Sequence, residues 1–138
     1  MNGASRESPL VTVLITAYNE SEYIEEAVRS VLAQTYDHLE AVVINDGSTD
    51  ETGNVLRRRF DDGRLRVVNQ ERKGRVRSLN HGLDVAKGAF VAVLDADDRC
   101  RPNRIQRQVD YLLAHEDVGV VGAYYHRKDG IRGEEYVR

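Results

Sequence analysis

The chain has 138 residues, of which 41% are hydrophobic and 31% charged, with a formal net charge of −3. This balance excludes a disordered chain and is typical of one globular domain, and the small negative charge gives no overall attraction to nucleic acid or to an acidic membrane. The single cysteine, Cys100, excludes an internal disulfide, and no apolar run approaches the roughly 18 residues of a membrane span. We therefore expect a cytoplasmic protein, with a peripheral position at the inner face of the membrane left open.

Apolar, β-branched runs alternate along the chain with amphipathic stretches. We expect strands at 10–16, 39–44, 65–69, 90–94 and 118–123, separated by helices that contain 24–32, 50–60, 76–86 and 102–113. Strands that alternate with helices predict an α/β fold with a mostly parallel sheet and helices on both faces. Within this organisation, residues 1–9 are expected to be a disordered lead-in, 10–123 the folded domain, and 124–138 a polar tail or the beginning of a further part.

Short-range signals predict where the helices begin and end. Asn19 with Glu22, and Ser48 with Glu51, have the spacing of capping boxes at the starts of the first two helices. Gly88 has the position of a glycine just past the end of the third helix. The expected apolar face of that helix consists of Val76, Leu79, Leu83 and Ala86.

Polar residues follow three of the predicted strands, at 16–20, 45–48 and 95–98. Ligands of parallel sheets bind beyond the carboxyl ends of the strands, so these three segments should meet at one rim. Asp95, Asp97 and Asp98 stand out, because clustered carboxylates repel one another and the hard cations Mg²⁺ and Mn²⁺ prefer oxygen ligands. Acids after a strand are also common as turn formers and caps, so this cluster alone leaves both interpretations open.

Several other kinds of site have no signature in the chain. The glycine-rich dinucleotide motif, the phosphate-binding loop and the Gly-x-Ser-x-Gly elbow are all absent from the sequence. The four histidines do not have metal-ligand spacing. The arginine-rich segment 57–77 is interrupted by acids and contains only Phe60 as an aromatic residue, which favours a solvated surface over a nucleic-acid interface.

Three motifs occur in order at the expected rim: Thr-Ala-Tyr-Asn-Glu at 16–20, Asn-Asp-Gly-Ser-Thr-Asp at 45–50 and Leu-Asp-Ala-Asp-Asp at 94–98. Together with the run from 79 to 98, they resemble the hallmarks of family 2 glycosyltransferases with the GT-A fold, over residues 10–123. The resemblance implies inverting transfer of a sugar from a nucleotide-diphosphate sugar to an unknown acceptor, with a UDP-sugar as the expected donor and Mn²⁺ or Mg²⁺ as the cofactor.

The resemblance also implies roles on the nucleobase side of the site. Thr16 and Tyr18 would flank the base, with Tyr18 offering a packing face, and Glu20 would lie at the edge of the pocket. Asp46 would accept a hydrogen bond from the uracil ring N–H, which favours uracil over cytosine. The chain departs from the family at Asn45, where an aspartate is common.

On the phosphate side, the resemblance implies that Asp97 binds the divalent ion directly. Asp95 would contact the ion, a metal-bound water or the ribose, and Asp98 ranks below both because it could simply cap the next turn. Many family members carry an arginine just before an Asn-x-Gly triplet, and this chain does not. Arg75 and Arg77 are therefore expected to meet the diphosphate instead.

Inverting transfer also needs a general base that removes the proton of the acceptor hydroxyl. The family places this acid after the Asp-x-Asp half of the domain, so the catalytic residue is unknown here and is expected beyond Arg138. We therefore expect the donor-binding half of a transferase, with little turnover by itself and with an open sheet edge that favours self-association. Two alternatives stay open: a non-catalytic nucleotide- or partner-binding domain on the same fold, and a sugar-phosphate nucleotidyltransferase, which the absence of a glycine-rich loop after the first strand disfavours.

Overall fold

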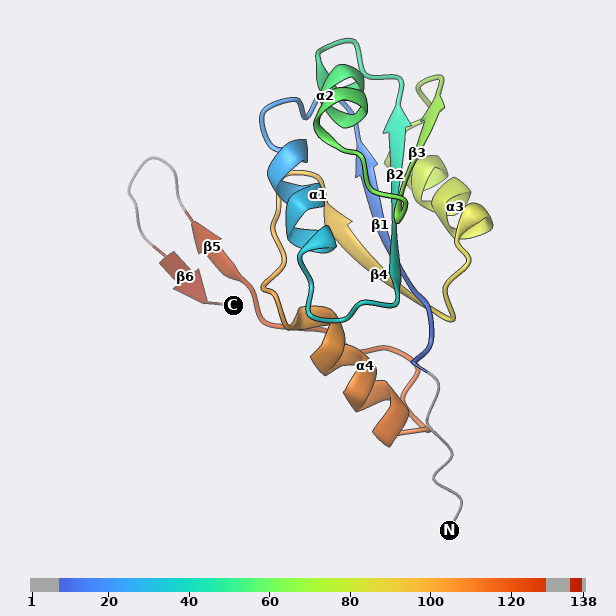
Figure 1. Cartoon of the computed structure of the whole chain (residues 1–138), viewed down its shortest axis with the longest axis vertical. Helices are drawn as coiled ribbons and strands as arrows, with labels where there is room; N and C mark the ends of the chain where they lie inside the picture. The colour runs from blue at the N-terminus through green and yellow to red at the C-terminus, as the bar shows by residue number, and fades with distance from the viewer. Residues whose placement is uncertain (1–7, 129–134, 138) are drawn as a thin grey trace. The chain divides into compact units, whose positions relative to one another are not determined.

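The computed structural model describes residues 8–128 and 135–137, and the chain divides into two compact units, residues 1–105 and 106–138. The elements, labelled in Figure 1, are β1 (Val11–Ala17), α1 (Ile24–Leu32), β2 (Leu39–Asp46), α2 (Thr52–Arg59), β3 (Leu65–Gln70), α3 (Arg75–Val85), β4 (Phe90–Asp95), α4 (Arg104–Ala114), β5 (His126–Lys128) and β6 (Glu135–Val137). The predicted disordered lead-in falls mostly outside the described residues, as does part of the predicted tail.

The first unit is built on a four-stranded parallel sheet with the order β3-β2-β1-β4. The chain crosses from β1 to β2 and on to β3 in one direction, and then returns past β1 to β4. Right-handed crossovers therefore place α1 and α2 on one face and α3 on the other, as Figure 1 shows. This arrangement confirms the predicted α/β class, with a parallel sheet and helices on both faces.

The core is centred on β1 and β2, the two inner strands. Both faces of these strands are covered, so their sequences are continuous apolar runs without the alternation of a half-exposed sheet. Leu14 and Ile15 of β1 and Val42 and Val43 of β2 are completely buried. The predicted apolar spacing of α1 is confirmed, because its buried residues are Ile24, Ala27, Val28 and Val31.

Only part of the apolar face predicted for α3 is correct. Leu79 packs on the core, but Val76 and Leu83 are 72% and 51% exposed. The helix instead turns Gly82 toward the sheet, where an added Cβ would collide with the side chain of Leu14. Because the helix approaches the sheet through a residue without a side chain, hydrophobic periodicity alone could not identify the buried face.

The predicted helix-end signals are wrong in the structure. α1 begins after Tyr23 and α2 after Glu51, and neither position carries a side-chain capping bond. Gly88 lies three residues past the end of α3 and does not adopt a positive φ. Its N–H donates to Thr12 Oγ1 at 2.9 Å, and an added Cβ would collide with the backbone of Thr12. The glycine is required by this close approach to β1, which is a tertiary contact.

In the second unit, the strand predicted at 118–123 is wrong. These residues have no regular structure, whereas β5 and β6 pair as a short antiparallel ladder. An apolar run becomes a strand only where a neighbour supplies hydrogen-bond partners, and no described strand pairs with 118–123. Within the described part of the chain, no helix combines the length and apolar character needed to cross a membrane.

Candidate functional site

The strand order reverses between β1 and β4, because β1 is followed in space by β2 on one side and by β4 on the other. Ligands of open parallel sheets bind at such a switch point, beyond the carboxyl ends of the strands. Thr16 near the end of β1 lies opposite Asp95 at the end of β4. The three polar segments predicted from the sequence therefore start from neighbouring strand ends, as expected.

Three carboxylates gather at the end of β4. Asp95, Asp97 and Asp98 each offer an oxygen, and these oxygens lie within 4.8 Å of one another. The backbone N–H of Asp98 donates to the carbonyl of Asp95 at 3.0 Å, which closes the turn that brings the acids together. An oxygen-only set of this kind suits Mg²⁺ or Mn²⁺. Asp98, which the sequence made the weakest of the three candidate metal ligands, lies with the other two.

The electrostatics of the cluster also favour a cation. Burial, followed by the charges of Asp97 and Asp95, raises the pKa of Asp98 above its ordinary value. Glu20, which follows β1, has its pKa raised by burial and then by the charges of Asp97, Asp50 and Asp95. Carboxylates that raise one another's pKa are held together at an electrostatic cost, and a bound cation would relieve it.

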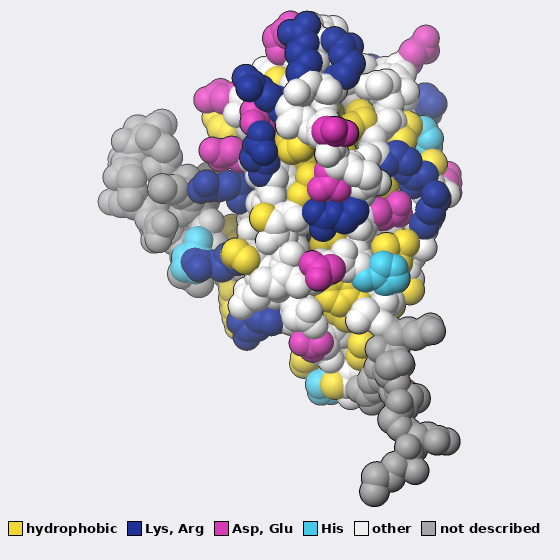
Figure 2. Space-filling model, viewed as in Figure 1, with side chains coloured by type: hydrophobic (Ala, Val, Ile, Leu, Met, Phe, Trp, Pro, Cys, Tyr) yellow, Lys and Arg dark blue, Asp and Glu magenta, His cyan; other side chains and the backbone are white. Residues whose placement is uncertain are grey.

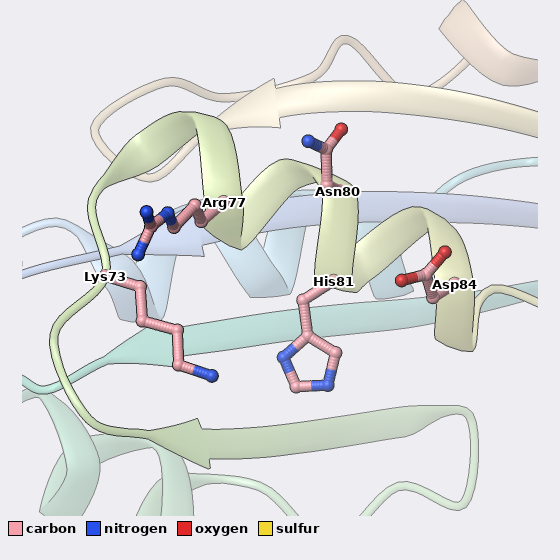
Figure 3. A pocket seen from close by; sticks show the side chains of 5 residues that line it. All are labelled: Lys73, Arg77, Asn80, His81 and Asp84. Carbon is pink, nitrogen blue, oxygen red and sulfur yellow. The ribbon is translucent and has the colours of Figure 1, made fainter.

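The structure brings one of the two predicted arginines to these acids. Arg75, the first residue of α3, places Nη2 at 2.6 Å from Asp95 Oδ1. Arg77 instead lines a surface hollow of about 420 Å³ on the flank of α3 (Figure 3), together with Lys73, Asn80, His81 and Asp84. Successive residues of an α-helix are turned by about 100° around its axis. Arg77, two residues after Arg75, therefore leaves the helix on nearly the opposite side from the acidic cluster.

Asp46, at the end of β2, is only 3% exposed and is surrounded by donors. Its Oδ1 accepts from Gln70 Nε2 at 2.9 Å and from the backbone N–H of Lys73 at 2.7 Å, and its Oδ2 accepts from the N–H of Gly74 at 2.9 Å. Burial raises the pKa of Asp46, but these hydrogen bonds outweigh it and bring the pKa below its ordinary value. Asp46 therefore organises the β3–α3 loop, a role that sequence reasoning missed.

Tyr18 is 37% exposed, and a residue that sequence reasoning also missed lies across it. The Arg72 guanidinium carbon is 3.2 Å from the centroid of the Tyr18 ring, and Arg72 Nη1 is 3.9 Å from Asp46 Oδ2. Gly47 makes this approach feasible: it has a φ of +70°, and an added Cβ would lie 2.6 Å from the backbone nitrogen of Arg72. In the sequence, Arg72 is one basic residue among many and carries no distinguishing signal.

The loops after β1 and β2 are tied to each other by Asn19, which has a φ of 54°. Its Oδ1 accepts from the backbone N–H of Thr49 at 2.8 Å, and its own N–H donates to Ser48 Oγ at 3.0 Å. Ser48 is therefore a link between loops, and its predicted capping role is wrong. Asp50 accepts from Thr52, and these bonds overcome the effect of burial and lower the pKa of Asp50 to about 2. The rim around Tyr18 is thus preorganised.

Asn45 departs from the aspartate that is common in the family, and the structure gives this departure a local reason. Its Nδ2 donates to Asn69 Oδ1 at 2.9 Å, between the ends of β2 and β3. An ionised aspartate has no proton to donate there. The substitution concerns the contact between two strands and leaves Asp46 in its predicted place.

Basic and acidic side chains are interspersed over the face shown in Figure 2. Several arginines of the segment 57–77 have acidic partners. Arg64 Nη2 lies 3.0 Å from Asp62 Oδ2, and Arg59 Nε lies 3.7 Å from Glu25 Oε2. This local pairing supports the interpretation of the segment as a solvated surface.

Known proteins are similar to this chain in sequence and in fold. The model of glycosyl transferase family 2 matches residues 12–138. The chain belongs to glycosyl transferase family 2. A Haemophilus influenzae protein described as an uncharacterized glycosyltransferase is 39% identical over 134 residues, which are 93% of this chain and 42% of that relative. This chain therefore spans about two fifths of that relative's length.

Solved structures confirm the predicted GT-A-type fold. The mannosyltransferase PcManGT from Pyrobaculum calidifontis, in complex with GDP-Man and Mn²⁺, is 35% identical with a TM-score of 0.71, over 78% of this chain and 33% of that one. S. aureus TarS 1–349 in complex with UDP-GlcNAc is 27% identical with a TM-score of 0.71, over 77% of this chain and 32% of that one. Both neighbours bind nucleotide sugars, and this chain covers about one third of each.

Proposed function

We propose that this chain binds a UDP-sugar together with Mn²⁺ or Mg²⁺ and is the donor-binding part of an inverting glycosyltransferase. The observation that carries the proposal is the group of three carboxylates, Asp95, Asp97 and Asp98, at the switch point of the sheet. Membership of glycosyl transferase family 2 supports it.

The chemistry of the donor explains why this arrangement suits it. In glycosyl transfer, the bond between the sugar C1 and the diphosphate oxygen breaks as an acceptor oxygen bonds to C1, and the diphosphate leaves with added negative charge. A divalent ion supplies stabilisation of that charge when it is bound. Asp97 and Asp95, with Asp98 beside them, are the residues that would hold the ion. Arg75, paired with Asp95, adds a positive charge on the same side.

On the nucleobase side, we propose that Asp46 and Tyr18 bind uracil, with Thr16 also flanking the base and Glu20 at the edge of the pocket. Oδ2 of Asp46 accepts the backbone N–H of Gly74, and a carboxylate oxygen has a second lone pair that the N3–H of the base would use. Cytosine carries an acceptor at the same ring position, so Asp46 would disfavour it. The exposed ring of Tyr18 supplies a surface on which a planar base can stack.

Calorimetry on the full chain tests this proposal. UDP should bind with measurable heat in the presence of Mn²⁺ or Mg²⁺, and at least about tenfold more weakly without a metal, because the cation bridges like charges. CDP should bind more weakly than UDP under the same conditions. Absence of any metal-dependent binding of UDP would overturn the proposal, and equal affinity for UDP and CDP would remove the role of Asp46.

Self-association through a sheet edge stays a prediction. β4 is an outer strand of the described sheet, and Val91 and Val93 on it are exposed. Sedimentation velocity over a range of concentrations measures it, and a monomer at every concentration would contradict it.

A further inference from the structure

Arg72 contacts both residues that are proposed to bind the nucleobase. Its guanidinium carbon lies 3.2 Å from the centre of the Tyr18 ring, and its Nη1 lies 3.9 Å from Asp46 Oδ2. The three residues come from three different segments: the loop after β1, the end of β2 and the loop between β3 and α3. The guanidinium therefore occupies the space between an aromatic face and a carboxylate oxygen.

A guanidinium satisfies the same physical requirements as a uracil ring in that space. Both are planar, both can lie flat on a tyrosine ring, and both present N–H donors at an edge. The two oxygens of Asp46 already accept three N–H donors from Gln70, Lys73 and Gly74. The remaining acceptor position on Oδ2 is on the atom that Arg72 faces, so a base and the guanidinium would compete for it.

The backbone of Arg72 is held in place while its side chain is free to leave. On one side, Gly47 packs so closely that an added Cβ would lie 2.6 Å from the Arg72 nitrogen. On the other side, the next two N–H groups, of Lys73 and Gly74, donate to Asp46. The side chain itself is 51% exposed, and rotation about its own bonds would carry the guanidinium into solvent.

We propose that the guanidinium of Arg72 occupies the nucleobase subsite in the free protein, and that the base of the nucleotide displaces it. This inference rests on the proposed function, because it takes Tyr18 and Asp46 to be the base-binding residues. It adds a residue that competes with the ligand, so that part of the binding energy of the base is spent on removing Arg72 from the Tyr18 ring.

Uridine is the probe that isolates this competition. It carries the base without phosphates, so loss of the positive charge of Arg72 cannot weaken an attraction to phosphate. In Arg72→Ala, uridine should bind roughly threefold to tenfold more tightly than in the wild-type chain, as expected for the loss of a partly exposed cation–π contact and a long ion pair. Arg58→Ala, which removes an exposed arginine of α2, is the matched control and should leave the affinity within about twofold of the wild type.

A second measurement observes the contact between the Arg72 guanidinium and the Tyr18 ring without any ligand. The arginine Nε–H signals of the chain are followed by NMR, and that of Arg72 should be shifted by the ring current of Tyr18. Both Tyr18→Leu and saturation with uridine should move it toward the value of an exposed arginine. If uridine binds, an unchanged Arg72 signal or an unchanged affinity in Arg72→Ala would overturn the inference while the proposed function stands. Failure of both uridine and UDP–Mn²⁺ to bind any of these proteins would overturn the proposed function, and the inference with it.

Discussion

Two groups of carboxylates share one rim of the sheet: the first is Asp46 alone, and the second is Asp95, Asp97 and Asp98. The two differ in how their charge is accommodated. Asp46, at the end of β2, is buried, accepts three N–H donors from the chain, and has a lowered pKa. At the end of β4, Asp97 and Asp98 are exposed, and their mutual repulsion contributes to the raised pKa of Asp98. The first group is stabilised by the protein itself, whereas the second is arranged for a positive partner.

The position of each strand in the sheet explains the difference. β2 is an inner strand, and the loop from β3 to α3 folds over its end and supplies backbone N–H groups. β4 is an outer strand of the described sheet, and Arg75 is the cation that pairs with its terminal Asp95. Buried charge requires complete hydrogen bonding, so Asp46 is a structural anchor as much as a candidate ligand contact.

The largest effect should come from removing the central acid of the second group. Asp97→Ala should weaken metal-dependent binding of UDP by about 100-fold, because one ligand oxygen of the proposed ion is lost. The thermal midpoint of the metal-free chain should stay within about 2 °C of the wild type, since Asp97 is exposed. Calorimetry and thermal denaturation measure both quantities. Unchanged binding of UDP with Mn²⁺ would show that the β4 group does not bind the ion.

Next, the surroundings of Asp46 should depend on Gly47, which lets the β3–α3 loop approach the end of β2. Gly47→Ala should lower the free energy of unfolding by about 2 kcal/mol, because alanine is strained at a φ of +70° and its Cβ would collide with the Arg72 backbone. Gly63→Ala is the matched control, with no atom within 4 Å of the added Cβ, and should change stability by less than about 0.5 kcal/mol. Urea denaturation of the two variants gives the comparison, and equal stabilities would contradict it.

A similar loss is expected when the anchor itself is neutralised. Asp46→Asn should reduce the free energy of unfolding by about 1.5 to 2 kcal/mol. One oxygen that accepts a backbone N–H is replaced by an NH₂ group, which cannot accept that hydrogen bond. Asp61→Asn, at an exposed position after α2, provides the control and should be nearly neutral. The same urea measurement applies, and a neutral Asp46→Asn would mean that these hydrogen bonds do not stabilise the loop.

Lowering the pH should separate the hydrogen-bonded carboxylates, whose pKa is lowered in the folded chain, from those whose pKa is raised. Asp50 has a folded-state pKa of about 2, below that of the unfolded chain, so its stabilisation is present above about pH 4 and is lost as the pH falls toward 2. Asp50→Asn should therefore cost about 1 kcal/mol at pH 7, and the difference from the wild type should vanish near pH 2. Chemical denaturation at a series of pH values tests this, and a difference that is constant with pH would contradict it.

The smallest expected effect has the opposite sign. The pKa of Asp98 is raised in the folded chain, so ionised Asp98 destabilises the fold above that pKa and the destabilisation disappears as the pH falls through it. In metal-free buffer at pH 7, Asp98→Asn should raise the free energy of unfolding by a few tenths of a kcal/mol. Calorimetric unfolding at pH 7 and pH 4 measures the gain. A loss of stability at pH 7 would show that Asp98 is held by partners of its own.

The comparison between the two groups also shows how far sequence reasoning could reach. Asp95, Asp97 and Asp98 lie within four consecutive residues, so their proximity follows from local covalent geometry at the end of a recognisable strand. The two backbone donors of Asp46 come from residues 27 and 28 positions further along, at Lys73 and Gly74. Backbone N–H groups are the same at every residue other than proline, so nothing in the sequence singles out these two.

The sequence by itself determined the α/β class, the family and the three rim segments, because strand and helix periodicities and polar residues at strand ends are local patterns. Only the tertiary structure decided that Gly82 faces the sheet, that 118–123 has no strand partner, that Arg75 joins the acids while Arg77 does not, and that Arg72 lies on Tyr18. Each of these depends on contacts between residues far apart in the chain. Their free energies are set by which surfaces the fold brings together, and a pattern of neighbouring residues does not record this.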